Sequence, residues 1–282
     1  MCVNERTISH FLFMYLKFYG FKEAPFNITP DPRFLFFAQH HREAFDHLIY
    51  GIEHRKGFIE LTGEVGSGKT TICRAVLASL ARNVKTSLVL NPWLTENQLL
   101  RAILHDFGLA AKGRDRLACL ETLNAFLLEQ LRQNNNVALI IDEAQDLAPA
   151  VLEQVRLLSN LETDQHKLLQ IVLCGQPELS QRLATPDLRQ LRQRITVRYH
   201  LFPLTEAELR QYIDHRLKMA GWQGDEIFSD EAVRRVYHYS AGIPRLINAV
   251  CDVTLLAGYV ARIRRLDGEY VSKAIQQLEG GS

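Results

Sequence analysis

Short apolar segments alternate with longer segments of helical periodicity over the first two thirds of this 282-residue chain. The apolar segments predict strands, which cover 57–62, 87–90, 137–141, 168–174 and 195–199. Continuous apolar strands separated by helices are typical of a parallel sheet with both faces covered. The pattern therefore predicts an α/β fold with a five-stranded parallel sheet.

Helical patterns connect the strands and then fill the rest of the chain. Within 40–55, Ala44, Leu48 and Ile52 repeat every four residues, as on the buried face of a helix. Further helices are predicted near 69–80, 95–107, 116–132 and 149–161. From Thr205 to Gln277 only helical patterns occur, about four of them. A small, all-helical domain is therefore expected after the α/β part.

The first residues fit neither pattern. The segment 21–37 is rich in phenylalanine, and its three prolines exclude a regular helix, so its aromatic rings predict an irregular segment packed onto something else. Residues 1–13 are expected to be a disordered extension or to follow from a misplaced start codon. We expect an N-terminal extension and linker over 1–36, an α/β domain over 37–202 and a helical domain over 203–282.

A glycine-rich turn follows the first predicted strand and fits G-x-x-x-x-G-K-[ST] at every fixed position. Glycines let backbone N–H groups surround phosphate oxygens, and the helix that starts there presents its positive end. Lys69 is expected to reach the β- and γ-phosphates of ATP, and the Thr70 hydroxyl to bind Mg²⁺. The candidate nucleotide-binding residues are Gly63, Glu64, Val65, Gly66, Ser67, Gly68, Lys69, Thr70 and Thr71.

The third predicted strand ends in two acids, Asp142 and Glu143. Ligands of open α/β sheets bind at the carboxyl ends of the strands. Asp142 is expected to hold Mg²⁺, and Glu143 to orient and deprotonate the attacking water. The alternative is a solvated acidic helix start, where acids are also favoured. With a phosphate loop upstream, the pair predicts an ATPase.

Polar residues elsewhere are candidates to complete the site. Gln176 follows the fourth strand and would lie near the γ-phosphate if that strand neighbours the acidic one. Arg194 is the first candidate for an arginine that contacts a neighbouring subunit's ATP, with Arg189 or Arg192 second, and a solvated basic face is the alternative. Arg245 begins a helix in the C-terminal domain and is a candidate γ-phosphate contact.

Composition limits the partners and the cellular compartment that the sequence favours. The formal net charge of +1 gives no overall attraction to nucleic acid. A compact cluster of arginines within 262–265 is a weak signal for nucleic-acid binding. The five cysteines are far apart, so buried, reduced thiols are expected.

No run approaches the ~18 apolar residues of a membrane span, and no signal peptide is recognisable, so a cytoplasmic protein is predicted. The adjacent histidines His40 and His41 are a poor metal site, because neighbouring side chains on a helix point in different directions. Phe26, Phe34 and Phe36 are candidates for covering adenine or for packing in a core.

In this order, the phosphate loop, the Asp-Glu pair, Gln176, the arginine-rich helix and Gly-Ile-Pro-Arg at 242–245 resemble an AAA+ ATPase. The segments 15–21, 25–32, 157–163 and 191–195 resemble the general secretion pathway protein A (ExeA) family more closely, including ATPases of the MshM type and those that accompany exosortase clusters. The resemblance covers about residues 14–278. It implies a helical lid, ATP hydrolysis at subunit interfaces in a homo-oligomer, and protein partners in a bacterial envelope system. It also implies that Gln176 is the first sensor and Arg245 the second.

The sequence departs from that family at one place. The secretion-pathway members continue into a membrane span and a periplasmic part, whereas this sequence stops at Ser282, so a direct cell-wall role is not expected. The leading hypothesis is an ATPase that energises assembly of a secretion, pilus or exopolysaccharide system. The alternatives are an ATP-gated DNA-binding regulator of the transposition type, and a nucleotide-binding switch with negligible turnover.

Overall fold

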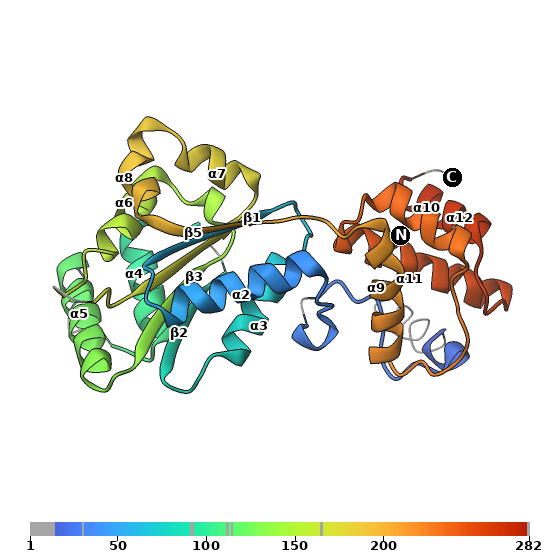
Figure 1. The fold of residues 1–282 in the computed structure, drawn as a ribbon, viewed down its shortest axis with the longest axis horizontal. Coiled ribbons are helices and arrows are strands. Elements are labelled where there is room, and N and C mark those ends of the chain that lie inside the picture. The colour runs from blue at the N-terminus through green and yellow to red at the C-terminus, as the bar shows by residue number, and fades with distance from the viewer. Residues whose placement is uncertain are drawn as a thin grey trace. The chain divides into compact units, whose positions relative to one another are not determined.

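The structure is a computed structural model that describes residues 15–29, 31–90, 93–110, 113, 115–163 and 166–280. Their contacts divide the chain into two units (Figure 1). The nucleotide unit contains Gln39–Val65 and Lys69–Phe202. The helical unit contains the described residues up to Ala38, then Gly66–Gly68, and the chain from Pro203 onward. Each unit has its own hydrophobic core.

The nucleotide unit is built on a parallel sheet, as the apolar segments predict. Its strands are β1 (Phe58–Gly63), β2 (Val84–Val89), β3 (Asn136–Ile141), β4 (Gln170–Gly175) and β5 (Ile195–Leu201). They lie in the order β2-β3-β4-β1-β5, and every neighbouring pair is parallel. Every residue of β1, β3 and β4 is buried, which explains why these strands read as continuous apolar runs.

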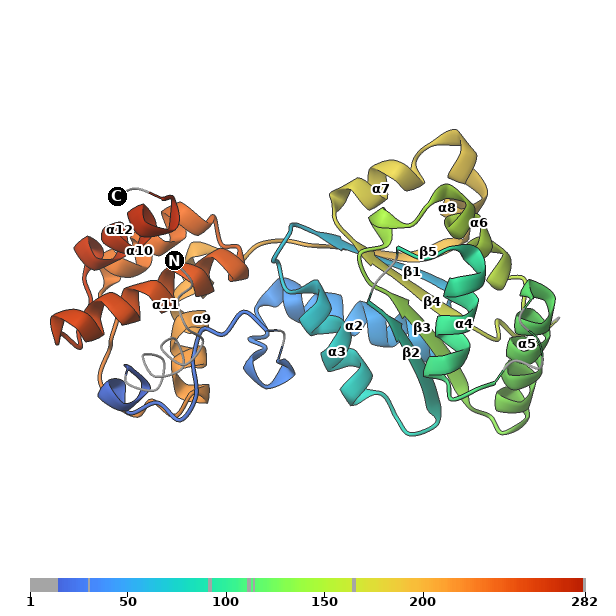
Figure 2. The same ribbon diagram turned by 180° about the vertical axis from the view of Figure 1, so that it is seen from behind.

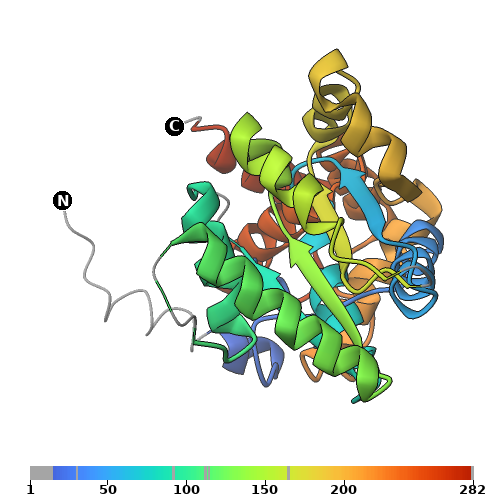
Figure 3. The ribbon, with the colours of Figure 1, turned by 90° about the vertical axis from the view of Figure 1, so that its left-hand side faces the viewer.

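Helices cover the sheet on both sides (Figures 1 and 2). On one side, α2 (Gln39–Glu53) and α3 (Lys69–Ser79) contact β1 and β4. The other side carries α4 (Glu96–Asp106), α6 (Pro149–Leu158), α7 (Pro177–Leu183) and α8 (Arg189–Arg194). The helix α5 (Arg116–Arg132) packs against α4 and leads into β3 (Figure 3). Short 3₁₀ helices occupy Pro32–Phe34 (η1), Ala144–Asp146 (η2) and Pro186–Leu188 (η3).

Local signals set where these helices begin. Thr95 and Gln98 form a capping box at the start of α4, and the Asp115 carboxylate accepts a hydrogen bond from the backbone of Ala118 in α5. Pro149 and Pro177 open α6 and α7, where a missing backbone N–H costs nothing. The starts of these helices are therefore fixed by capping side chains and by prolines at the first helical position.

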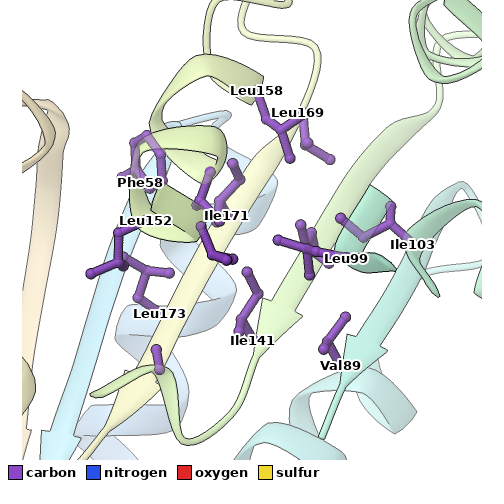
Figure 4. Close-up of a cluster of buried hydrophobic side chains, with 14 of the residues drawn as sticks. Phe58, Val89, Leu99, Ile103, Ile141, Leu152, Leu158, Leu169, Ile171 and Leu173 are labelled. Atoms are coloured by element: carbon purple, nitrogen blue, oxygen red, sulfur yellow. The ribbon is translucent and has the colours of Figure 1, made fainter. Parts of the chain in front are cut away.

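The core between the sheet and α4 and α6 is apolar and closely packed (Figure 4). Ile141, Ile171 and Leu173 point from β3 and β4 toward Leu99 of α4 and Leu152 of α6, and all five are fully buried. Burial of side chains of this size stabilises a fold by about 1.5–3 kcal/mol each. This rigid layer fixes the carboxyl ends of the strands, on which the candidate site stands.

The helical unit contains the four helices expected from the sequence: α9 (Glu206–Met219), α10 (Asp230–Ser240), α11 (Pro244–Ala261) and α12 (Gly268–Leu278). The N-terminal segment packs into the same core. The hydroxyl of Tyr15 donates to Asp252 Oδ1 at 3.0 Å, and that of Tyr19 donates to the carbonyl of Leu255 at 3.2 Å. The sequence pattern did not indicate that this segment packs in the core of the helical unit, because it reads as an extension and linker.

The proline- and phenylalanine-rich segment is fastened to α9 by a buried arginine. Arg216 Nε donates to the carbonyl of Pro25 at 2.6 Å, and its Nη2 donates to the carbonyl of Asn27 at 3.0 Å. Its guanidinium also lies over the ring of Phe34, 4.9 Å from the centroid. The irregular segment thereby satisfies backbone carbonyls that have no partner in a strand or helix.

Replacing Arg216 with methionine is expected to destabilise the helical unit by about 2–4 kcal/mol, because two charge-assisted hydrogen bonds are lost and two carbonyls lose their partner. The chain has two tryptophans, so in a Trp93→Phe background urea unfolding followed by Trp222 fluorescence reports on this unit alone. The exposed Arg234→Ala is the matched control. Equal unfolding midpoints for the two variants would contradict the fastening role of Arg216.

Candidate functional site

Three segments with candidate chemistry meet at the carboxyl edge of the sheet. The phosphate loop follows β1, Asp142 and Glu143 follow β3, and Gln176 follows β4. Because β4 lies between β1 and β3 and all three strands are parallel, their carboxyl ends lie side by side. The condition set for Gln176 in the sequence, that its strand neighbour the acidic strand, is therefore met.

The phosphate loop has the backbone that its glycines predict. Gly66 and Gly68 have φ angles of +80° and +102°, a region that side chains with a Cβ rarely enter. The helix α3 begins at Lys69, so the first N–H groups of that helix have no intrahelical acceptor and its positive end faces the loop. This geometry suits an anion such as a polyphosphate.

The ammonium group of Lys69 lies within the loop. The side chain is buried, and its Nζ donates to the carbonyl of Gly63 at 2.8 Å and to that of Glu64 at 3.0 Å. These hydrogen bonds hold the ammonium against the first two carbonyls of the loop. A cation on the end of a flexible stem can exchange such contacts for phosphate oxygens.

Thr70 and Asp142 test whether the residues fit a magnesium ion. Thr70 Oγ1 donates to Asp142 Oδ2 at 2.6 Å, which joins the first turn of α3 to the end of β3. A hydroxyl and a carboxylate are hard oxygen ligands of the kind that Mg²⁺ prefers, and nucleotide sites hold it through one or two protein groups plus phosphates. In the described part of the chain, no cluster of three His, Cys, Asp or Glu offers a metal cage. The pair therefore fits Mg²⁺ bound together with a nucleotide.

The second acid lies beside two amides. Glu143 has a φ of 51° in the left-handed region, which is uncommon for a residue other than glycine and which gathers at functional sites. Its Oε2 accepts hydrogen bonds from Gln145 Nε2 at 2.9 Å and from Gln176 Nε2 at 3.4 Å. Gln145 was not among the residues predicted from the sequence. The signal that could have indicated it is an amide side chain shortly after the acidic pair Asp142 and Glu143.

The arginine-rich helix α8 makes contacts within its own chain. Arg194 Nη1 donates to Asn160 Oδ1 at 2.7 Å, to the carbonyl of Arg156 at 3.3 Å and to Ser159 Oγ. These contacts close the carboxyl end of α6, a position that favours a cation. Arg189 and Arg192 are exposed. The contact of any of the three with a neighbouring subunit stays a prediction.

Arg245 stands in the first turn of α11 and is exposed. Its backbone N–H donates to the carbonyl of Gly66 at 3.2 Å, and both residues fall in the helical unit as its contacts define it. The aromatic candidates belong to that unit as well. Phe26 and Phe34 are buried in its core, and Phe36 packs on Tyr212. Of the two roles considered for these rings, core packing is the one that their contacts support.

The remaining candidates have ordinary environments. Cys73, Cys119, Cys174 and Cys251 are free and buried, as expected, and Cys2 lies outside the described residues. A hydrogen bond with Cys73, together with burial, raises the pKa of the Cys174 thiol well above its usual value. His40 Nδ1 lies 3.2 Å from the hydroxyl of Tyr199. None of the helices in the described part of the chain has the length and apolar character needed to cross a bilayer.

Comparison with known proteins shows which proteins share these features. A family described as "AAA domain" matches residues 52–183. The chain is 44% identical over 268 residues to General secretion pathway protein A of Aeromonas hydrophila, and the match covers 95% of this chain and 49% of that protein. The chain thus spans about half the length of this relative. These matches confirm the resemblance drawn from the motifs.

Solved structures show the fold. The Drosophila ORC bound to DNA matches with a TM-score of 0.68 at 18% identity, covering 99% of this chain and 68% of that chain. The Aeropyrum pernix ORC1 protein in complex with DNA matches with a TM-score of 0.66 at 18% identity, covering 89% and 68%. The Thermotoga maritima RuvB Holliday junction branch migration motor matches with a TM-score of 0.58 at 20% identity, covering 86% and 70%. The predicted fold class, a P-loop α/β unit of the AAA+ type followed by helices, is confirmed.

Proposed function

We propose that this AAA+ chain, a relative of general secretion pathway protein A, binds ATP with Mg²⁺ and hydrolyses it. The observation that carries the proposal is the 2.6 Å hydrogen bond from Thr70 Oγ1 to Asp142 Oδ2, with Glu143 as the next residue. It brings together two oxygen ligands suited to Mg²⁺ and a further carboxylate at the edge of the sheet that carries the phosphate loop. A site with this composition can bind a nucleotide and activate water.

Each residue then has a defined task. The backbone of the loop and Lys69 hold the β- and γ-phosphates, while Thr70 and Asp142 hold Mg²⁺. Bound Mg²⁺ neutralises charge on the phosphate oxygens. Glu143 accepts the proton of the attacking water, and the Gln176 amide orients that water or the γ-phosphate. The family resemblance assigns Arg245 the role of γ-phosphate sensor.

The proposed cellular role rests on this relative and on the family resemblance. We propose that the chain forms a homo-oligomer on the cytoplasmic side of the inner membrane and energises assembly of an envelope system through protein partners. General secretion pathway protein A supports the class of system. The DNA-binding alternative is tested by ATP-dependent retention on duplex DNA, which would weaken steeply as salt is raised.

Hydrolysis between subunits predicts that the ATPase rate per subunit climbs with protein concentration to a plateau. Arg194→Ala is expected to lower that plateau by ~10²-fold with ATP binding kept, less than the ~10³–10⁵ of a sole trans-acting arginine, because Arg189 and Arg192 stand on the same helix. The measurement is steady-state phosphate release against protein concentration. A rate per subunit that stays flat would place hydrolysis within single subunits.

Mixing two impaired variants separates the trans role of Arg194 from its place at the end of α6. A Glu143→Gln subunit still offers Arg194, and an Arg194→Ala subunit still offers Glu143. If the arginine acts across an interface, the mixture is more active than the average of its parts. If the mixture only matches that average, Arg194 acts within its own subunit, as a cap of α6.

A further inference from the structure

Gln145 lies at the centre of the polar cluster beyond β3 and β4, and both ends of its amide are engaged. Its Nε2 donates to Glu143 Oε2 at 2.9 Å and to Asp146 Oδ2 at 3.3 Å, while its Oε1 accepts a hydrogen bond from the backbone N–H of Gln176 at 3.0 Å. The first contact reaches the candidate base, and the second reaches the start of the segment that carries the candidate sensor. One amide therefore links the ends of two neighbouring strands.

The surroundings constrain both the backbone and the side chain of Gln145. Arg182 of α7 donates from Nη1 to the carbonyl of Gln145 at 2.5 Å. At Gly175, a built Cβ would lie only 2.7 Å from Gln145 Oε1, so the absence of a side chain at the end of β4 leaves the space that the amide occupies. Because the oxygen and the nitrogen of the amide have different partners, the group cannot turn over without breaking its hydrogen bonds to Glu143, Asp146 and Gln176.

We propose that Gln145 is a positioning residue that fixes the carboxylate of Glu143 relative to Gln176, so that the base and the γ-phosphate sensor keep one geometry. The proposal rests on the proposed hydrolytic function of Glu143. The left-handed backbone of Glu143 needs such support, because surrounding contacts must maintain a conformation that costs about 1–3 kcal/mol. The Gln176 side chain closes the triangle, since its own Nε2 donates to the same oxygen at 3.4 Å.

The decisive measurement is a double-mutant cycle on steady-state ATP hydrolysis. Gln145→Met keeps the length of the side chain and removes all three hydrogen bonds of the amide, to Glu143, to Asp146 and from the Gln176 N–H. It is expected to lower kcat by ~10–100-fold, since loss of positioning alone can cost about 10²-fold, while KM and the affinity for a non-hydrolysable ATP analogue stay within about twofold. In a Glu143→Gln background the same substitution is expected to change the rate by less than about threefold, because the group that it positions is gone.

A matched control is available on α5 and at its end. Gln133 Nε2 donates to Glu129 Oε1 at 2.8 Å, an exposed copy of the same amide–carboxylate contact, so Gln133→Met is expected to leave kcat unchanged. Gln145→Glu is the second test variant, because it preserves shape and can still accept from the Gln176 N–H. It turns a donor toward Glu143 into a like charge, so its kcat is expected to fall below that of Gln145→Met.

These measurements distinguish a failure of the positioning role of Gln145 from a failure of the proposed hydrolytic role of Glu143. Glu143→Gln measured alone tests the hydrolytic role, and unchanged turnover in that variant would overturn both proposals. If Glu143→Gln lowers turnover as expected but Gln145→Met loses the same further factor in both backgrounds, Gln145 acts independently of Glu143 and the positioning role is wrong. Wild-type kcat in both Gln145→Met and Gln145→Glu would overturn it as well, with the ATPase assignment left intact.

Discussion

Lys69→Ala is expected to abolish ATP binding. Lys69 is buried within the phosphate loop, where its ammonium is held by two loop carbonyls. With a nucleotide bound, the same group would make charge-assisted contacts to the β- and γ-phosphates, each worth about 1.5–3 kcal/mol. Loss of two such contacts corresponds to roughly 10²–10⁴-fold weaker binding, which titration with a fluorescent ATP analogue measures directly.

A second readout, the unfolding temperature, distinguishes loss of ATP binding from misfolding of the variant. Saturating ATP should raise the unfolding temperature of the wild type but not that of Lys69→Ala, because a ligand stabilises only the state that binds it. Lys85→Ala, which removes an exposed lysine from β2, is the control and should behave as the wild type. Normal nucleotide affinity in Lys69→Ala would mean that residues 63–70 are not the nucleotide site.

Glu143→Gln is expected to lower turnover by ~10³-fold while ATP still binds. The amide matches the carboxylate in size but cannot take a proton from water, and a positioned general base contributes about 10²–10⁴-fold. Its amide oxygen can still accept the hydrogen bonds that Gln145 and Gln176 now donate. Phosphate release and nucleotide affinity, measured on the same preparation, separate the loss of chemistry from a loss of binding.

The control for this substitution is Glu121→Gln, an exposed glutamate on α5 that should leave turnover unchanged. If Glu143→Gln hydrolyses ATP as fast as the wild type, the acid is not the base. A low rate that ignores the substitution would instead identify a nucleotide-binding switch, the third of the hypotheses that the sequence permits.

The sequence by itself determined the elements and the phosphate loop. Strands buried on both faces must be apolar throughout, and a loop with φ angles of +80° and +102° at Gly66 and Gly68 needs glycine, so both features leave a local signature. These inferences need only backbone geometry and periodicity. For Gln176 the sequence set only a condition, that its strand neighbour the strand of Asp142, and the β3–β4 pairing met it.

The tertiary structure alone decided which distant side chains meet. Nothing local in the Pro- and Phe-rich segment shows that Arg216, almost two hundred residues later in the chain, holds the carbonyl of Pro25. Nor does the arginine-rich helix show that Arg194 closes the end of α6. Gln145 resembles any amide after an acidic pair until the β3–β4 pairing brings Gln176 to it. Such contacts depend on how whole elements pack, and packing is a property of the assembled core that no short stretch of sequence contains.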